Sequence, residues 1–130
     1  MEWQEFEKYV REIASFRWGC SAVSKTYNGV RCDCILEVSA DHWVAVEITQ
    51  ERDLDKIRRD ILKLCSVRNA LFSQDNIYCE CFIVMQDAPT DSMRATGEGQ
   101  KVKVMSAEEF RNEFFDYSKY VFVRKQRQFG

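Results

Sequence analysis

The chain has 130 residues, of which 45% are hydrophobic and 31% charged, as expected for one globular domain spanning residues 1–130. Its net charge of −2 excludes a generally basic nucleic-acid-binding coat, so any nucleic-acid contact must come from a local patch. No apolar run reaches the ~18 residues of a membrane span, and the acidic, amphipathic N-terminus does not resemble a signal peptide. We therefore expect a cytoplasmic (intracellular) protein without membrane contact.

The first half of the chain predicts one helix followed by three antiparallel strands. Apolar residues recur at helical spacing through residues 1–16, and strand-forming runs follow. Asn28-Gly29 is a two-residue hairpin signal between the first two runs, and a short polar turn, Ser39 to His42, joins the second to the third. The expected strands are Cys20 to Tyr27, Val30 to Val38 and Trp43 to Gln50.

The second half predicts a long helix over Asp53 to Phe72 with Asp53 as its N-cap, and a buried strand over Ile77 to Met85. Residues 87–100 are expected to form a mobile polar loop that closes over a site. The remaining expected elements are a strand over 101–105, a helix to about residue 117 opened by the capping box Ser106–Glu109, and an edge strand over 120–124. The pattern predicts an α+β (or α/β) fold with a central mixed sheet of four to five strands flanked by helices.

Asp33 and Glu47 are the residues that fit their strands least well. A charged group inside a buried strand costs several kcal/mol, in order of magnitude, unless it is paired or bound to a metal. The two share a face only if the hairpin has an odd-length loop or a bulge. A three-residue loop centred on Asp41 pairs Asp33 with Thr49 and makes the two carboxylates diagonal neighbours. That arrangement suits one divalent cation.

Other charged residues leave two interpretations open. Glu7 is either a solvated helix acid or a third carboxylate that leans toward the site. Lys56, Arg59 and Lys63 form a stripe on the long helix that is either a solvated face or a cationic edge directed at the site or at a nucleic-acid backbone. His42, the only histidine, lies in a turn, and a surface role is favoured over that of a base.

Six cysteines occur, four of them in two Cys-x-Cys pairs within expected strands (Cys32 and Cys34, Cys79 and Cys81). The expected intracellular setting argues against a disulfide framework. The spacing usual for zinc ligands is missing, so reduced cysteines in the core are favoured over a structural zinc site. Each pair is expected to place both thiols on one face of its strand.

The order of helix, three strands, helix and strand, with acids on the second and third strands, resembles the restriction-endonuclease-like superfamily, the PD-(D/E)xK nucleases, over about residues 1–85. Asp33 matches the aspartate of the first motif, preceded here by cysteine in place of proline. Glu47-Ile48-Thr49 stands at the (D/E)-x-K motif, with threonine in place of lysine. Glu7 resembles the first-helix glutamate that many members carry. The resemblance implies an αβββαβ core.

The resemblance also implies Mg²⁺ or Mn²⁺ bound by Asp33, Glu47, the Ile48 carbonyl and Glu7. In the family the motif lysine orients the attacking water and offsets negative charge, whereas threonine brings no positive charge. The lysine can be recruited from elsewhere in such proteins. Lys25, Lys56 and Gln50 are the candidates; Gln50 has the wrong strand parity unless a bulge intervenes, so Lys56 and Lys25 are favoured over it. Thr49 can still hydrogen-bond a water. Lys56, Arg59 and Lys63 are then expected to contact phosphate.

Three functions remain open at this point. The first is a metal-dependent nuclease that acts on nucleic acid, with DNA favoured over RNA. The second is the same fold without catalytic activity, kept for nucleic-acid binding or protein assembly, which Thr49 and the net negative charge favour. The third is an unrelated α+β interaction domain, in which the two acids would face apart. A homodimer, or association with a larger multidomain protein, is compatible with each of them.

Overall fold

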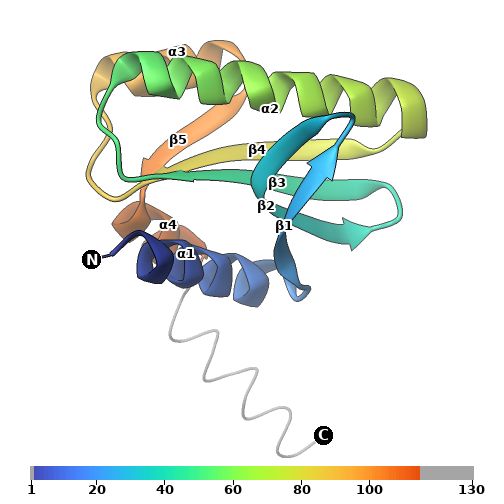
Figure 1. Cartoon of the computed structure of the whole chain (residues 1–130), viewed down its shortest axis with the longest axis horizontal. Helices are drawn as coiled ribbons and strands as arrows, with labels where there is room; N and C mark the ends of the chain where they lie inside the picture. Colours follow the sequence, from blue (N-terminus) through green and yellow to red (C-terminus); the bar gives the residue numbers. More distant parts are fainter. Residues whose placement is uncertain (1, 115–130) are drawn as a thin grey trace, which may run out of the picture.

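A computed structural model describes residues 2–114, which form one mixed five-stranded sheet between two helical layers (Figure 1). The strands lie in the order β1-β2-β3-β4-β5, with the first three antiparallel and β3, β4 and β5 parallel. The elements are α1 (Trp3–Trp18), β1 (Ala22–Tyr27), β2 (Val30–Ser39), β3 (His42–Thr49), α2 (Leu54–Asp75), β4 (Tyr78–Met85), α3 (Asp91–Gly99), β5 (Val102–Ser106) and α4 (Ala107–Phe114). The coarse α+β prediction is confirmed. The strand expected over 120–124 lies outside the described residues.

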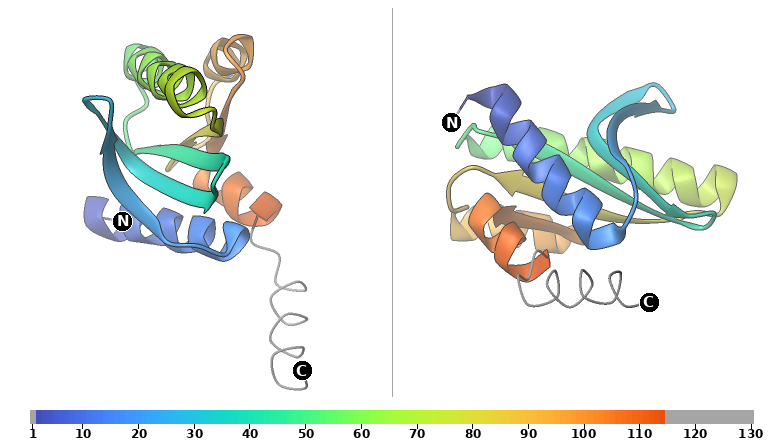
Figure 2. Two further views of the ribbon diagram at one scale, coloured as in Figure 1. Left: turned by 90° about the vertical axis from the view of Figure 1, so that its right-hand side faces the viewer. Right: turned by 90° about the horizontal axis from the view of Figure 1, so that it is seen from below.

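The two faces of the sheet are covered by different helices (Figure 2). Helices α2 and α3 pack on one face, where Ile57, Leu64 and Ile83 are fully buried. Helices α1 and α4 pack on the other face, where Phe6, Val46 and Phe110 are buried. Each face therefore has its own apolar core, and a side chain can be assigned to a face by the core that it joins. Within the described residues, no helix combines the length and the apolar character needed to cross a membrane.

The register of the β2–β3 hairpin differs from the prediction. Ser39 pairs with His42 across a two-residue turn, so the expected three-residue loop is wrong. The register then shifts by one residue between Glu37 and Ser39, and Cys34 pairs with Val46. This bulge supplies the one extra residue that a three-residue loop was expected to supply. Continuing the register by one step places Asp33 opposite Glu47 instead of opposite Thr49.

A second bulge lies beside Asp33 itself. Val23 pairs with Ile35 while Lys25 pairs with Cys32, so Asp33 and Cys34 together stand opposite the single residue Ser24. Because one residue is extra, Cys32 joins the core under α2 and Cys34 joins the core under α1. The expectation that these two thiols share a face is therefore wrong.

The second Cys-x-Cys pair and the hairpin signal behave as predicted. Cys79 and Cys81 both join the core under α2. All six cysteines are free thiols, and four of them are buried. Asn28 and Gly29 have φ angles of 51° and 77°, the left-handed backbone that a two-residue hairpin turn requires.

Residues 87–100 do not form the predicted loop, because α3 occupies most of them. The Thr90 hydroxyl accepts a hydrogen bond from the Met93 backbone N–H and caps the helix, and Met93 is buried. Gly97 packs against β5 so closely that a Cβ there would lie 2.5 Å from the Val102 carbonyl oxygen. Gly97 lies within the expected loop, but it is needed for the close contact between α3 and β5.

Both predicted helix caps are confirmed. The Asp53 carboxylate accepts from the Asp55 N–H at the start of α2. In the capping box of α4, the Glu109 N–H donates to the Ser106 hydroxyl, and the Ser106 N–H donates to the Glu109 carboxylate at 3.4 Å. The second cap fixes the chain where it leaves the last parallel strand.

Candidate functional site

The bulge at Asp33 turns both the backbone and the side chain of this residue to unusual partners. Its carboxylate oxygen Oδ2 accepts a hydrogen bond from the Ile48 N–H of β3 at 3.0 Å. Its carbonyl oxygen accepts from the Arg11 guanidinium of α1, at 2.9 Å from Nη2 and 3.3 Å from Nε. The Asp33 carboxylate thus pairs with a backbone donor of the neighbouring strand β3.

Glu47 lies on β3 at the same level of the sheet and is completely buried. The Nζ atom of Lys63, from α2, lies 2.9 Å from Glu47 Oε1 and forms an ion pair with it. The angles of that contact fall short of a hydrogen bond, so both Glu47 carboxylate oxygens are without a well-formed donor among the described residues. A fully buried carboxylate in this condition is costly for the fold.

The protonation of Glu47 reflects this environment. The pKa of Glu47 is raised from its ordinary 4.5 to about 9, first by burial and then by the hydrogen bond and negative charge of Asp33, while Lys63 opposes the shift. Burial alone would lower the pKa of Lys63, but contact with Glu47 and the charge of Asp33 raise it on balance. At neutral pH these shifts favour a protonated Glu47 beside a charged Lys63.

A second lysine–carboxylate pair lies on α2 next to the first. The Lys56 Nζ donates to both Asp60 carboxylate oxygens, at 2.7 and 2.8 Å, and Asp60 is only 3% exposed. Burial raises the pKa of Asp60, and Lys56 and Lys63 oppose this. We call Asp33, Glu47, Asp60, Lys56 and Lys63 the carboxylate–lysine cluster.

The remaining predicted site residues lie elsewhere. Glu7 forms an ion pair with Arg11 at 3.2 Å, so it reaches Asp33 only through that arginine. The Lys25 ammonium lies 3.0 Å from Glu37 and 4.8 Å from the centre of the Trp43 ring, four positions before Glu47 on β3.

Two polar residues that end or follow β3 make local contacts. The buried Thr49 hydroxyl accepts from the Glu51 N–H at 3.0 Å. The Gln50 amide donates to the Gln86 side chain at 2.7 Å. His42, at the other end of β3, stacks on Tyr78 and lies 3.5 Å from Glu80, so it is far along the strand from the cluster.

The lysine stripe splits into inward and outward members. Lys56 and Lys63 turn toward buried carboxylates, and Arg59 is exposed. Lys56 and Lys63 therefore match the interpretation of the stripe as a cationic edge directed at the site, and Arg59 matches a solvated face. Lys63, for which a phosphate contact is expected, contacts Glu47.

The donor set was tested for its fit to a hard divalent cation. Among residues 2–114, no three His, Cys, Asp or Glu side chains converge on one point, so Glu7 does not complete a three-carboxylate site. Mg²⁺ is nevertheless commonly held by one or two carboxylates, with waters in the remaining positions. The half-buried Asp33 and the buried Glu47 offer carboxylate oxygens on adjoining strands beside the Lys63 ammonium. Asp33, Glu47 and the Ile48 carbonyl fit such an ion.

Asp60 and Arg11 were missed by reasoning from the sequence. Asp60 did give a signal, because it falls within the apolar stripe of α2 between Ile57 and Leu64, where only a residue with an internal partner is expected. Arg11 gave no signal, because nothing in the pattern of α1 separates it from a solvated arginine.

Comparisons of the chain with protein-family models, with curated proteins and with solved structures found no match.

Proposed function

We propose that the chain has a restriction-endonuclease-like core and is a metal-dependent phosphodiesterase (nuclease) that acts on nucleic acid, with DNA favoured over RNA. The observation that carries the proposal is the side-chain contact of Asp33 and Glu47 on adjoining strands, with Lys63 2.9 Å from Glu47. The order α1, β1, β2, β3, α2, β4 supports it, because it is the order of the family core.

In this proposal Asp33, Glu47 and the Ile48 carbonyl hold one Mg²⁺ or Mn²⁺. When bound, the ion would polarise a phosphodiester oxygen and lower the pKa of the attacking water. The Ile48 N–H fixes the orientation of the Asp33 carboxylate, so the site is organised before substrate arrives.

Lys63 supplies the positive charge that Thr49 cannot. It comes from α2 instead of β3, and its ammonium is close enough to Glu47 to interact with any group held there. Its role is to offset the negative charge that develops on phosphate in the transition state. Lys56 is already held by Asp60, so Lys63 replaces it as our candidate for the recruited lysine.

A plasmid-cleavage assay tests the proposal. The full chain with Mn²⁺ is expected to nick or linearise supercoiled DNA, and Asp33→Ala is expected to reduce cleavage to background. Asp55→Ala is the matched control, because it removes an exposed carboxylate of α2 that lies outside the cluster. Absence of cleavage by the unaltered chain with either Mg²⁺ or Mn²⁺ would contradict the proposal.

The second candidate is a catalytically inactive module of the same fold. It is favoured by Thr49, whose hydroxyl is already engaged by the Glu51 N–H, and by Lys63, which contacts Glu47 without a metal. Calorimetry separates the two functions. A nuclease should give heat on Mn²⁺ titration that Asp33→Ala removes, whereas the inactive module should give none.

A further inference from the structure

Strand β4 is longer than its neighbour β5, and part of its edge is open. Pairing with β5 begins at Cys81 and Val102, so Tyr78 to Glu80 have no strand neighbour on that side among the described residues. Lys101, with a φ of 57°, turns the chain into β5 and marks the point where pairing starts.

The backbone groups on the open edge can be identified. The Tyr78 N–H donates to the Asp41 carbonyl oxygen on the β3 side. Because successive residues of a strand direct their N–H and C=O groups to opposite neighbours, the Cys79 groups point to the open side. The Cys79 carbonyl has there only a long 4.0 Å contact with its neighbour, the Cys81 thiol. Such an edge is a template for another strand.

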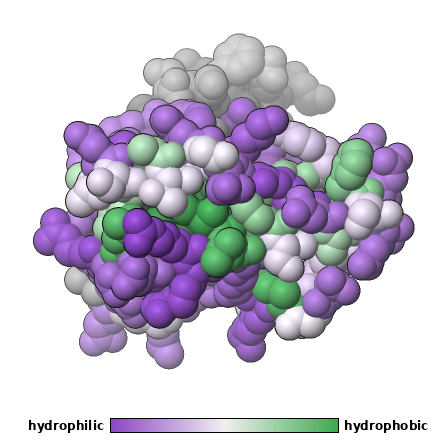
Figure 3. Space-filling model, turned by 90° about the horizontal axis from the view of Figure 1, so that it is seen from above, coloured by the Kyte–Doolittle hydropathy of each residue, from purple (hydrophilic) through white to green (hydrophobic). Residues whose placement is uncertain are grey.

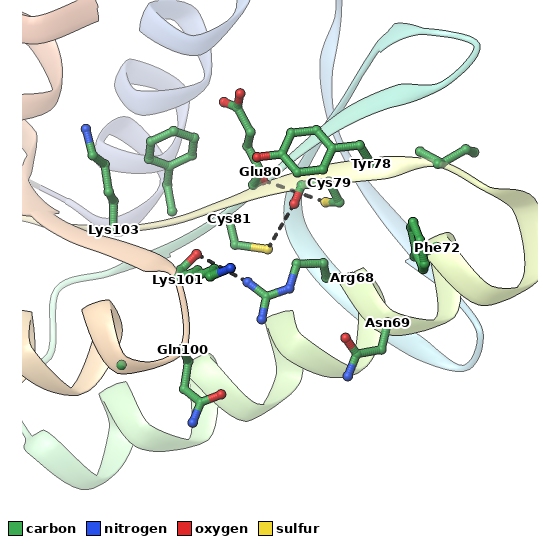
Figure 4. Close-up of a pocket in the computed structure, with 13 residues that line it drawn as sticks. Arg68, Asn69, Phe72, Tyr78, Cys79, Glu80, Cys81, Gln100, Lys101 and Lys103 are labelled. Carbon is green, nitrogen blue, oxygen red and sulfur yellow. Dashed lines mark hydrogen bonds between the residues drawn. The ribbon is translucent and has the colours of Figure 1, made fainter.

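A cavity of about 720 Å³ surrounds this edge (Figure 4). Tyr78 and Glu80 project to one side of β4, and Cys81 projects to the other side, toward Arg68. The walls of the cavity therefore come from both faces of the sheet, and the edge of β4 lies between them. This shape admits an extended chain beside β4.

The walls combine exposed aromatic side chains with positive charge. Phe72 is 66% exposed and Tyr78 61% exposed, which is unusual for large rings that have no partner surface. Figure 3 shows apolar residues exposed among polar ones on the face that α2 and α3 cover. Arg68 and Lys101 supply positive charge on the α2 side, and the Arg68 guanidinium donates to the Lys101 carbonyl at 3.2 Å. The other charged lining residues are paired, Lys103 with Glu113 and Glu80 with His42.

We propose that this open edge binds an extended segment of a partner protein as an added strand, with an acidic side chain toward Arg68 and Lys101 and an apolar one toward Tyr78. Hydrogen bonds to the Cys79 backbone would give affinity, and the alternating side-chain pockets would give selectivity. An acidic side chain is expected on the α2 side, because the lining cations without an ion-pair partner among residues 2–114 lie on that side of the strand. The proposal is independent of the nuclease proposal, since this edge lies at the opposite end of the parallel strands from Glu47.

The test uses the full chain and a fluorescein-labelled seven-residue peptide of alternating valine and glutamate. We expect a rise in fluorescence anisotropy with a Kd below about 1 mM, and changed NMR shifts with slowed hydrogen exchange at the Cys79 amide. A peptide with lysine in place of glutamate, and one N-methylated at alternate residues, should not bind.

Two surface variants localise the contact. Phe72→Ala is expected to weaken binding about tenfold or more, as loss of an aromatic anchor does, and Lys101→Glu at least about threefold, as a charge reversal at a rim does. Leu62→Ala is the matched control, because it removes another exposed apolar residue of α2 that does not line the cavity. Circular dichroism of each variant checks the fold.

Three results would overturn the proposal. No peptide binding at 1 mM would do so. Binding of a short oligothymidylate that the same two variants weaken, in place of the peptide, would assign the surface to nucleic acid. A dimer in sedimentation that Phe72→Ala dissociates would assign it to a second copy of the chain.

Discussion

The Cys-x-Cys sequence occurs in both β2 and β4, and the two copies fold differently. In β4 the strand is regular and both thiols lie in the core under α2. In β2 the thiols lie in opposite cores, because a bulge adds one residue between Cys32 and Ile35. The residue between the cysteines is glutamate in β4, where it is half-exposed and faces His42, and aspartate in β2, where it enters the cluster. The same spacing therefore gives a regular strand in one place and a site in the other.

The difference shows what the bulge contributes. In a regular β2, Asp33 would contribute only backbone hydrogen bonds to the ladder, and its carboxylate would not accept from a β3 backbone donor. In the bulged strand the Arg11 guanidinium satisfies the Asp33 carbonyl, and the carboxylate accepts from the Ile48 N–H. Irregular strand geometry of this kind is typical of positions that aim a side chain at a site.

The largest expected effect is on catalysis and comes from the loss of Lys63. Lys63→Met should lower the rate of Mn²⁺-dependent DNA cleavage about 100-fold, because loss of one charge-stabilising donor typically costs that much. Arg59→Met is the control, since it removes the same charge from an exposed position of the same helix. Single-turnover rates at saturating protein measure both. A Lys63→Met protein that cleaves at the normal rate would assign the lysine to folding alone.

The next effect concerns stability and pH at Glu47. Folding raises the pKa of Glu47 from 4.5 to about 9, so the folded state binds the Glu47 proton more tightly than the unfolded state does. The free energy of folding that this contributes is fully present below about pH 4.5 and is lost as the pH rises toward 9. Without added metal, the free energy of unfolding of the unaltered chain should therefore fall between pH 5 and pH 8 by about 2–4 kcal/mol more than that of Glu47→Gln.

Urea denaturation at both pH values, with EDTA present, measures the difference. Equal pH dependence in the two proteins would mean that Glu47 is ionised in the folded state. Addition of Mg²⁺ should reduce the difference, because a cation bound at Glu47 stabilises the ionised carboxylate and so the folded state.

Much of the fold could be predicted because it is encoded locally. The helix caps at Asp53 and Ser106 and the Asn28-Gly29 turn each depend on a few neighbouring residues, and all are found. Helix α3 was missed because Thr90 and Gly97 act there as a cap and as a contact with β5, and the second role depends on a strand that follows it.

The candidate site could be predicted in part. Asp33 and Glu47 were recognisable because each is a charge in a buried strand, and they do lie side by side. Their predicted register was wrong because the β2–β3 pairing shifts at a bulge between Glu37 and Ser39, which no sequence signal distinguishes from a longer turn. Lys63 could not be assigned because its distance from Glu47 depends on how α2 packs on the sheet, which helical periodicity does not determine.

A smaller effect is expected from the hydrogen bond that the bulge allows. Asp33→Ala leaves the Ile48 N–H without its acceptor and should lower the free energy of unfolding by about 1–3 kcal/mol. Asp33→Asn keeps a carbonyl oxygen in the same place and should cost less than about 1 kcal/mol, although it removes one metal ligand. Thermal or urea denaturation compares them. If the two variants lose the same stability, the contact with Ile48 does not hold the bulge.

The smallest expected effect is a difference in thiol reactivity between the two Cys-x-Cys pairs. Burial raises the pKa of both Cys32 and Cys34 to about 12. In β4, the neighbouring Cys79 thiol and the Arg68 charge lower the pKa of Cys81 in spite of its burial. Since the thiolate is the reactive form, iodoacetamide at pH 8 should label Cys81 at least about tenfold faster than Cys32 or Cys34.

Peptide mapping by mass spectrometry at successive times measures this order. Arg68→Gln should slow labelling of Cys81 and leave the slow rates of Cys32 and Cys34 unchanged, because this side chain lines the cavity beside β4. The partly exposed Cys20 and Cys65 serve as internal references for reagent access. If Cys32 and Cys81 react at one common rate, both are reached only by unfolding of the whole domain, and the contrast between the bulged and the regular strand does not extend to their chemistry.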